Sequence, residues 1–223
     1  MPALALALAY PLLAHLAAYW RSPLLAALSC TVLVVLVLYP GLRARRALAW
    51  LALALALAAA SWLARSELAA LPLYLPPVLV PGFMAWLFGR TLVRGRRPLI
   101  ERMAAHLHGS EPLDPGIPAY ARRVTAVWAV VLATLAAINL LLALLAVPGG
   151  VLEAVGITPS LPVSQQLWSL VANLGTYAAI AALFVGEYLW RRRRFPALPH
   201  LGFGDFLARV VKLPRSFWRG LVE

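Results

Sequence analysis

The sequence predicts an all-α polytopic membrane bundle of about six transmembrane helices, with both termini in the cytoplasm. Three observations lead to this prediction. Of the 223 residues, 63% are apolar and only 13% are charged, which leaves too little polar surface to cover a soluble globular core. Six stretches are each long and apolar enough to cross a bilayer, for which about 20 residues are needed. Finally, the basic residues gather in alternate connections between these stretches.

The six predicted spans contain no Lys, Arg or Asp, and they lie at residues 3–20, 23–40, 47–64, 69–89, 124–147 and 167–190. The first span lacks the basic residues that open a signal peptide, so we expect it to be retained. The fourth span is unusual because Pro72, Pro76, Pro77 and Pro81 remove backbone donors. It is either a kinked helix packed against its neighbours or a discontinuous helix that lines a substrate path.

Orientation follows from the distribution of positive charge. With a cytoplasmic N-terminus, 18 of the 20 basic residues lie in inner connections, and only Arg21 and Arg65 lie outside. Cytoplasmic connections of membrane proteins carry such an excess of Lys and Arg. The tryptophans near the ends of the spans are expected at headgroup level. They are Trp20, Trp62 and Trp168 on the outer side and Trp50, Trp86, Trp128 and Trp190 on the inner side.

This topology divides the chain into four parts. Residues 1–89 form the first four spans, and residues 90–123 form an Arg-rich cytoplasmic loop that contains an amphipathic helix. Residues 124–190 form the last two spans, and residues 191–223 form a basic cytoplasmic tail with a second amphipathic helix.

Both amphipathic helices are recognised by their apolar spacing. In the loop, Pro98 favours a helix start, and apolar residues recur at helical spacing from Leu99 to Leu107, just before Gly109. In the tail, apolar residues follow the same spacing from Phe203 to Val211. We therefore predict two interfacial helices on the inner membrane surface.

Arginine dominates the positive charge, filling 19 of the 20 basic positions. Anchoring next to anionic lipid accounts for a basic face by itself, at about 1 kcal/mol for each residue. The alternative is a recognition site for a lipid headgroup or an acidic carrier protein, because guanidinium groups bind phosphates and carboxylates bidentately. The candidate residues are Arg90, Arg96, Arg97, Arg102, Arg122, Arg123, Arg191 and Arg192. No nucleic-acid partner is expected, since lipid phosphates are already available to such a surface.

Polar side chains inside the predicted spans are candidate sites because they are costly to place in lipid. They are His15, Asn139, Asn173, Tyr177 and Glu187. Pairing of helices and binding of a ligand both remain open for this set. Glu187 precedes Arg191 by four residues, a spacing that favours a salt bridge on one helix face.

The candidates for catalysis are weak. They are Glu101, His106 and His108 in the loop, with Asp114 as a further partner. Two histidines that are two positions apart on a helix point in different directions, so we expect no metal site there. The single cysteine, Cys30, excludes a cysteine-rich metal site. The sequence also has no phosphate-binding loop, nucleophile elbow or zincin motif, and no cofactor is expected.

Four segments carry a resemblance to a known family. They read GFMAWLFGRTL at 82–92, PLIER at 98–102, YARRVT at 120–125 and FVGEY at 184–188. Together they resemble a family of bacterial multi-pass inner-membrane proteins encoded in gene clusters for aryl-polyene or xanthomonadin-type pigments. The resemblance covers roughly residues 75–196. It implies acyl carrier proteins and other biosynthetic proteins as neighbours, in a membrane setting.

The leading hypothesis is a non-enzymatic inner-membrane accessory protein of a polyene or fatty-acid-like lipid pathway. It would dock acidic partners or anionic lipid at its Arg-rich cytoplasmic face. Two alternatives stay open. A membrane-embedded acyl or lipid-headgroup transferase would use Glu101, His106 and His108. A small lipid transporter or flippase component would use the proline-rich fourth span and Asn173.

Overall fold

The computed structural model describes residues 2–63, 65, 71–93, 95–108 and 116–196. These residues are almost entirely helical, as predicted. Four helices are long and apolar enough to cross a membrane, namely Pro23–Arg43, Leu71–Arg90, Ile117–Leu145 and Gln165–Arg194. Two further apolar helices, at Ala5–Tyr19 and Ala47–Trp62, are shorter. The predicted tail helix from Phe203 to Val211 lies outside the described residues.

The chain divides into two compact units. Unit 1 contains Met1–Leu79 and Ala136–Ala179, and unit 2 contains Val80–Leu135 and Ile180–Glu223. Three helices, α4 (Leu71–Arg90), α6 (Ile117–Leu145) and α9 (Thr176–Arg194), contribute residues to both units.

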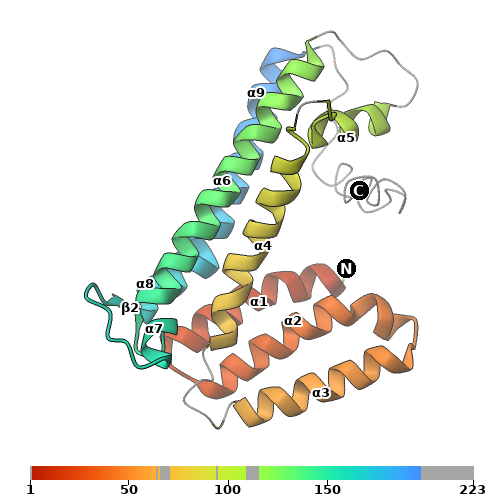
Figure 1. Cartoon of the computed structure of the whole chain (residues 1–223). Helices are drawn as coiled ribbons and strands as arrows, with labels where there is room; N and C mark the ends of the chain where they lie inside the picture. Colours follow the sequence, from red (N-terminus) through yellow and green to blue (C-terminus); the bar gives the residue numbers. More distant parts are fainter. Residues whose placement is uncertain (1, 64, 66–70, 94, 109–115, 197–223) are drawn as a thin grey trace. The chain divides into compact units, whose positions relative to one another are not determined.

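Unit 1 begins with three helices in a row, α1 (Pro2–Tyr19), α2 (Pro23–Arg43) and α3 (Ala47–Leu63), in which α2 packs against both neighbours (Figure 1). Ser22 caps α2 because its hydroxyl accepts a hydrogen bond from the Leu25 N–H at 3.4 Å. Close packing of α2 on α3 requires Gly41, where an added Cβ would lie 2.8 Å from the Cβ of Ala49. Small residues therefore set the spacing of these helices, as in other membrane bundles.

The rest of unit 1 follows α6. A parallel pair of two-residue strands, β1 (Ala146–Val147) and β2 (Val163–Ser164), flanks the short helix α7 (Val151–Ala154). The chain then continues through α8 (Gln165–Leu170) and the π-helix η1 (Val171–Gly175) into α9. The sixth predicted span is thus helical, but its π-helical turn and the strand pair before it had no signal in the apolar pattern.

The fourth predicted span is one uninterrupted helix, α4. The alternative of a discontinuous fourth span is therefore wrong. Pro72 lies in the first turn, where its missing N–H costs nothing. Pro76, Pro77 and Pro81 each remove one backbone hydrogen bond, but the flanking turns keep the helix continuous.

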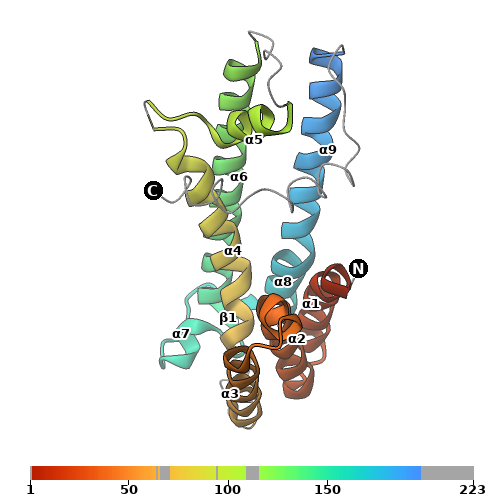
Figure 2. The same cartoon turned by 90° about the vertical axis from the view of Figure 1, so that its right-hand side faces the viewer.

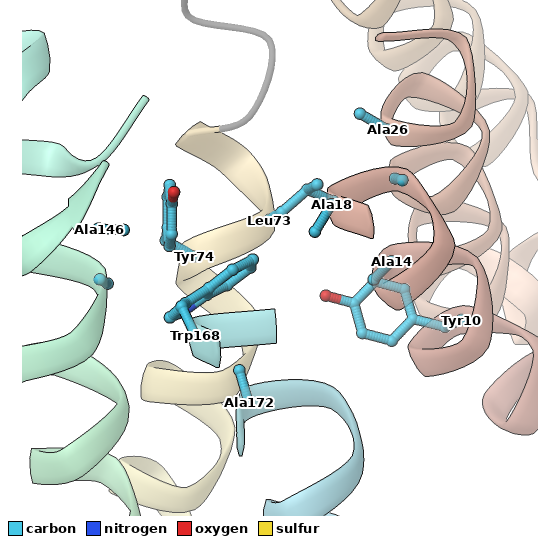
Figure 3. Packing of buried hydrophobic residues seen from close by; sticks show 11 residues of the cluster. Tyr10, Ala14, Ala18, Ala26, Leu73, Tyr74, Ala146, Trp168 and Ala172 are labelled. Atoms are coloured by element: carbon cyan, nitrogen blue, oxygen red, sulfur yellow. The ribbon is translucent and has the colours of Figure 1, made fainter. Parts of the chain in front are cut away.

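The core of unit 1 forms around Trp168, which is fully buried. Its ring lies 4.2 Å from that of Tyr74, measured between centroids. Figure 3 shows Trp168 between Tyr74 of α4 and the Tyr10 and Ala14 face of α1. Trp168 therefore does not present its ring to lipid headgroups as an anchor, because the ring fills the interior of the unit.

Unit 2 has its own core, in which Trp128 of α6 is 6% exposed. The Trp128 ring packs on Phe88 at 5.9 Å and edge-on against Phe184 at 4.5 Å. Trp128 is thus a second interior tryptophan rather than a headgroup anchor. In contrast, the other five tryptophans of the predicted interfacial set are exposed.

The predicted amphipathic helix of the loop is α5 (Leu99–His108), which runs across α4 and α6 rather than along them (Figure 2). Its apolar residues Leu99 and Met103 are buried against Trp128. The sequence predicts that this face lies on lipid, whereas the structure buries Leu99 and Met103 within unit 2.

Two threonines fix the start of α5. The Leu99 N–H donates to Thr91 Oγ1 at 3.0 Å, and the Ile100 N–H donates to Thr125 Oγ1 at 3.3 Å. The first N–H groups of a helix have no partner within the helix. Thr91 follows α4 and Thr125 belongs to α6, so these bonds attach α5 to both helices.

Candidate functional site

Exposed guanidinium groups gather in unit 2, and we call this set the arginine surface. It comprises Arg96, Arg97, Arg123, Arg192, Arg193 and Arg194. The first two precede α5, Arg123 lies near the start of α6, and the last three end α9. The described residues of unit 2 contain ten arginines and two acidic side chains, Glu101 and Glu187. This unit therefore carries a strong excess of positive charge.

Other predicted anion-binding arginines contact the protein itself. The Arg90 guanidinium lies over the Trp86 ring, 4.6 Å from its centroid, an arrangement that cation–π attraction stabilises. Arg122 Nη2 donates to the Leu92 carbonyl at 2.6 Å. Arg102 is half-buried on α5. The six members of the arginine surface are exposed, although Arg194 also lies over the Phe195 ring, 5.5 Å from its centroid.

The Glu187 carboxylate is paired with two partners within unit 2. Its Oε1 accepts the Tyr120 hydroxyl at 3.0 Å and lies 3.2 Å from Arg191 Nε. The salt bridge predicted from the spacing of Glu187 and Arg191 is therefore present. Phe195 packs edge-on against Tyr120, with 5.3 Å between ring centroids. These contacts hold the start of α6 next to the end of α9. The role of Glu187 in these contacts is structural.

Other predicted polar residues belong to two hydrogen-bonded groups in unit 1, both largely buried. His15 Nδ1 lies 3.0 Å from Ser169 Oγ, and Asn173 Nδ2 donates to the same oxygen at 3.1 Å. Asn139 Nδ2 donates to Thr176 Oγ1 at 2.9 Å, and this hydroxyl donates to the Val171 carbonyl at 3.1 Å. We call His15, Ser169 and Asn173 the polar chain.

The remaining candidates are more dispersed. Tyr177 is 47% exposed. Glu101 is half-buried and His106 is exposed, both on α5. The side chain of His108 and all of Asp114 lie outside the described residues. Among the residues that the structure does describe, no group of three His, Cys, Asp or Glu side chains is arranged to hold a metal ion.

Sequence reasoning missed Ser169, whose hydroxyl joins His15 to Asn173. It groups Thr176 with Asn173 and Tyr177 in the sixth span, but not with its partner Asn139. A signal for Ser169 was present, because it lies four positions before Asn173 and hence on the same helix face. By contrast, its pairing with His15, 154 positions away, could come only from the packing of α1 on α8.

The fold and these two sites define a helical protein with membrane-type helices, one basic surface and one buried polar chain. The chain matches no protein-family model, and neither a curated protein nor a solved structure is significantly similar to it.

Proposed function

We propose that this chain is a non-enzymatic accessory protein of the bacterial inner membrane that docks an acidic protein at its arginine surface. The observation that carries the proposal is the excess of exposed guanidinium groups in unit 2. The six arginines of the arginine surface are exposed, so their guanidinium groups can be reached by an anionic partner. In the pathway implied by the family resemblance, the partner would be an acyl carrier protein.

The proposal includes a topology of six spans with both termini in the cytoplasm. Four helices of sufficient length support it. The shorter helices α1 and α3 would complete the count, and 18 of the 20 basic residues would then lie inside. An Arg-rich cytoplasmic surface would raise the association rate of an acidic protein by electrostatic steering.

The described residues do not favour the transporter alternative or the transferase alternative. The transporter alternative relied on a broken fourth span and on Asn173. The helix α4 is uninterrupted, and the Asn173 amide bonds to Ser169 within unit 1. The transferase alternative relies on Glu101, His106 and His108, and none of the contacts described above favours it. Docking is therefore the function that the observed geometry supports best.

Removing charge from the arginine surface should weaken docking. We expect Arg96→Gln, Arg97→Gln, Arg123→Gln and Arg192→Gln together to weaken binding of an acyl carrier protein at least tenfold. Each basic residue contributes about 1 kcal/mol at an anionic surface, and about 1.4 kcal/mol is tenfold in affinity. Binding would be measured with the full chain in phosphatidylcholine nanodiscs, and affinity should fall further as salt is added.

The matched control removes the same charge from unit 1 through Arg21→Gln, Arg43→Gln, Arg45→Gln and Arg65→Gln. All four side chains are exposed. Equal affinity in both quadruple variants would refute docking at the arginine surface. The variant of the arginine surface could instead lose the enrichment of phosphatidylglycerol around the protein and keep its affinity for the carrier protein. That result would show that the surface anchors the protein to lipid instead.

Sidedness can be tested by labelling in a Cys30→Ala background. We expect a cysteine at Ala105 on α5 to react from the cytoplasmic side, because the Arg-rich connection is inside in the proposed topology. A cysteine at the exposed Ser160, between α7 and β2, should react from the other side. The measurement is labelling by a membrane-impermeant maleimide in intact and opened cells. Reaction of both cysteines from one side would contradict the six-span topology.

A further inference from the structure

Several buried polar atoms of unit 1 have no hydrogen-bond partner among the described residues, and three of them lie in α1, α8 and η1. They are Tyr10 Oη, Trp168 Nε1 and Asn173 Oδ1. Their side chains are 3%, 0% and 1% exposed, respectively. Burying such a group without a partner destabilises the folded state, because the group loses its hydrogen bonds to water. Three orphaned groups in one unit indicate that something else satisfies them.

These atoms belong to elements that pack together. α1, which carries Tyr10 and His15, contacts both α8 and η1, which carry Trp168 and Asn173. Figure 3 shows the hydroxyl of Tyr10 pointing from α1 toward Trp168 and Ala172. Ser169 Oγ connects His15 to the amide of Asn173. The polar chain therefore lies in the same α1–α8–η1 contact as the orphaned groups.

The π-helical turn fixes the orientation of this group. Within η1, the Thr176 N–H donates to the Val171 carbonyl. Thr176 Oγ1 donates to the same carbonyl and receives Asn139 Nδ2 from α6. This attachment holds the π-helical turn, while Asn173 bonds back to Ser169 toward α1. Single π-helical turns occur frequently at functional sites.

The chemistry of the three atoms specifies the ligand. An indole N–H is only a donor, an amide oxygen is only an acceptor, and a phenol hydroxyl is both. A group that pairs with all of them must both accept and donate hydrogen bonds. None of these three side chains carries a formal charge, so a charged ligand would have no counter-ion among them. A neutral hydroxyl group fits these requirements.

We propose that Tyr10, Trp168 and Asn173, with the adjacent polar chain, form an internal binding site for a neutral hydroxyl group. The hydroxyl is that of a water molecule or of a neutral lipid such as a monoacylglycerol. This site lies within unit 1, so it is independent of the docking proposed for unit 2.

The first test deletes single hydroxyl groups. Tyr10→Phe removes only Oη, and the matched control Tyr19→Phe removes a hydroxyl from the same helix at a side chain that is 59% exposed. If Tyr10 binds a hydroxyl ligand, Tyr10→Phe should lower the folded-to-unfolded equilibrium constant about fivefold. Tyr19→Phe should leave it unchanged. If the Tyr10 hydroxyl has no partner, its removal should leave the equilibrium constant unchanged or raise it. Either result for Tyr10→Phe would overturn the proposal.

The second test separates the two sources of the hydroxyl in the detergent-purified full chain. A bound water should make the buried Trp168 react in hydroxyl-radical footprinting, and Asn173→Leu should suppress that reaction at least threefold. A bound lipid should appear as a monoolein adduct in native mass spectrometry after monoolein is added, and Tyr10→Phe should remove it. Either result supports the site, and the absence of both signals refutes it.

Discussion

Replacing Trp168 by Ala is expected to lower the free energy of unfolding by about 3–5 kcal/mol. Trp168 is fully buried and packs on Tyr74 in the core of unit 1. Helices in a bilayer associate largely through packing, because lipid tails are as apolar as the side chains that they would replace. The truncation removes those packing contacts, and the surrounding helices relax only in part around the cavity.

The matched control is Trp20→Ala, because Trp20 is 63% exposed. We expect it to change the free energy of unfolding by less than about 0.5 kcal/mol, as exposed substitutions usually do. Unfolding of the full chain in mixed micelles would be followed by far-ultraviolet circular dichroism, a signal that depends on helix content. Equal destabilisation by Trp168→Ala and Trp20→Ala would mean that Trp168 is not the centre of the core.

The double variant Thr91→Val and Thr125→Val is expected to detach the start of α5. Valine keeps the shape of threonine but cannot accept the N–H groups of Leu99 and Ile100. Each buried N–H left without a partner costs about 1–3 kcal/mol. Leu99 is only 3% exposed, so water does not replace the lost bond in the packed state. We expect hydrogen exchange in α5 to accelerate at least tenfold.

Thr31→Val provides the control for this double variant. Thr31 Oγ1 donates to the Ala27 carbonyl within α2 at 2.8 Å, so its loss leaves the start of α5 unchanged. Exchange would be measured by mass spectrometry on peptides that cover residues 95–108. Unchanged exchange there in the double variant would show that packing of Leu99 and Met103 holds α5 without the threonines.

Local properties of the chain made part of the candidate site predictable. The Glu187–Arg191 pair follows from a four-residue spacing on one helix. The clustering of arginines before α5 and at the end of α9 can be read directly along the sequence. Which arginines contact the protein could not be predicted, because Arg122 meets the Leu92 carbonyl across 30 positions.

The sequence by itself determined that the chain forms apolar helices, where most of them lie, and where positive charge gathers. Hydropathy and charge are carried by consecutive residues, so they can be read without knowing which helices meet. The tertiary structure alone decided that Trp168 and Trp128 are interior, that protein buries Leu99 and Met103 of α5, and that His15 reaches Ser169. These outcomes depend on contacts between distant segments, and the same apolar or polar side chain can face lipid, protein or a ligand until the partner helix is fixed.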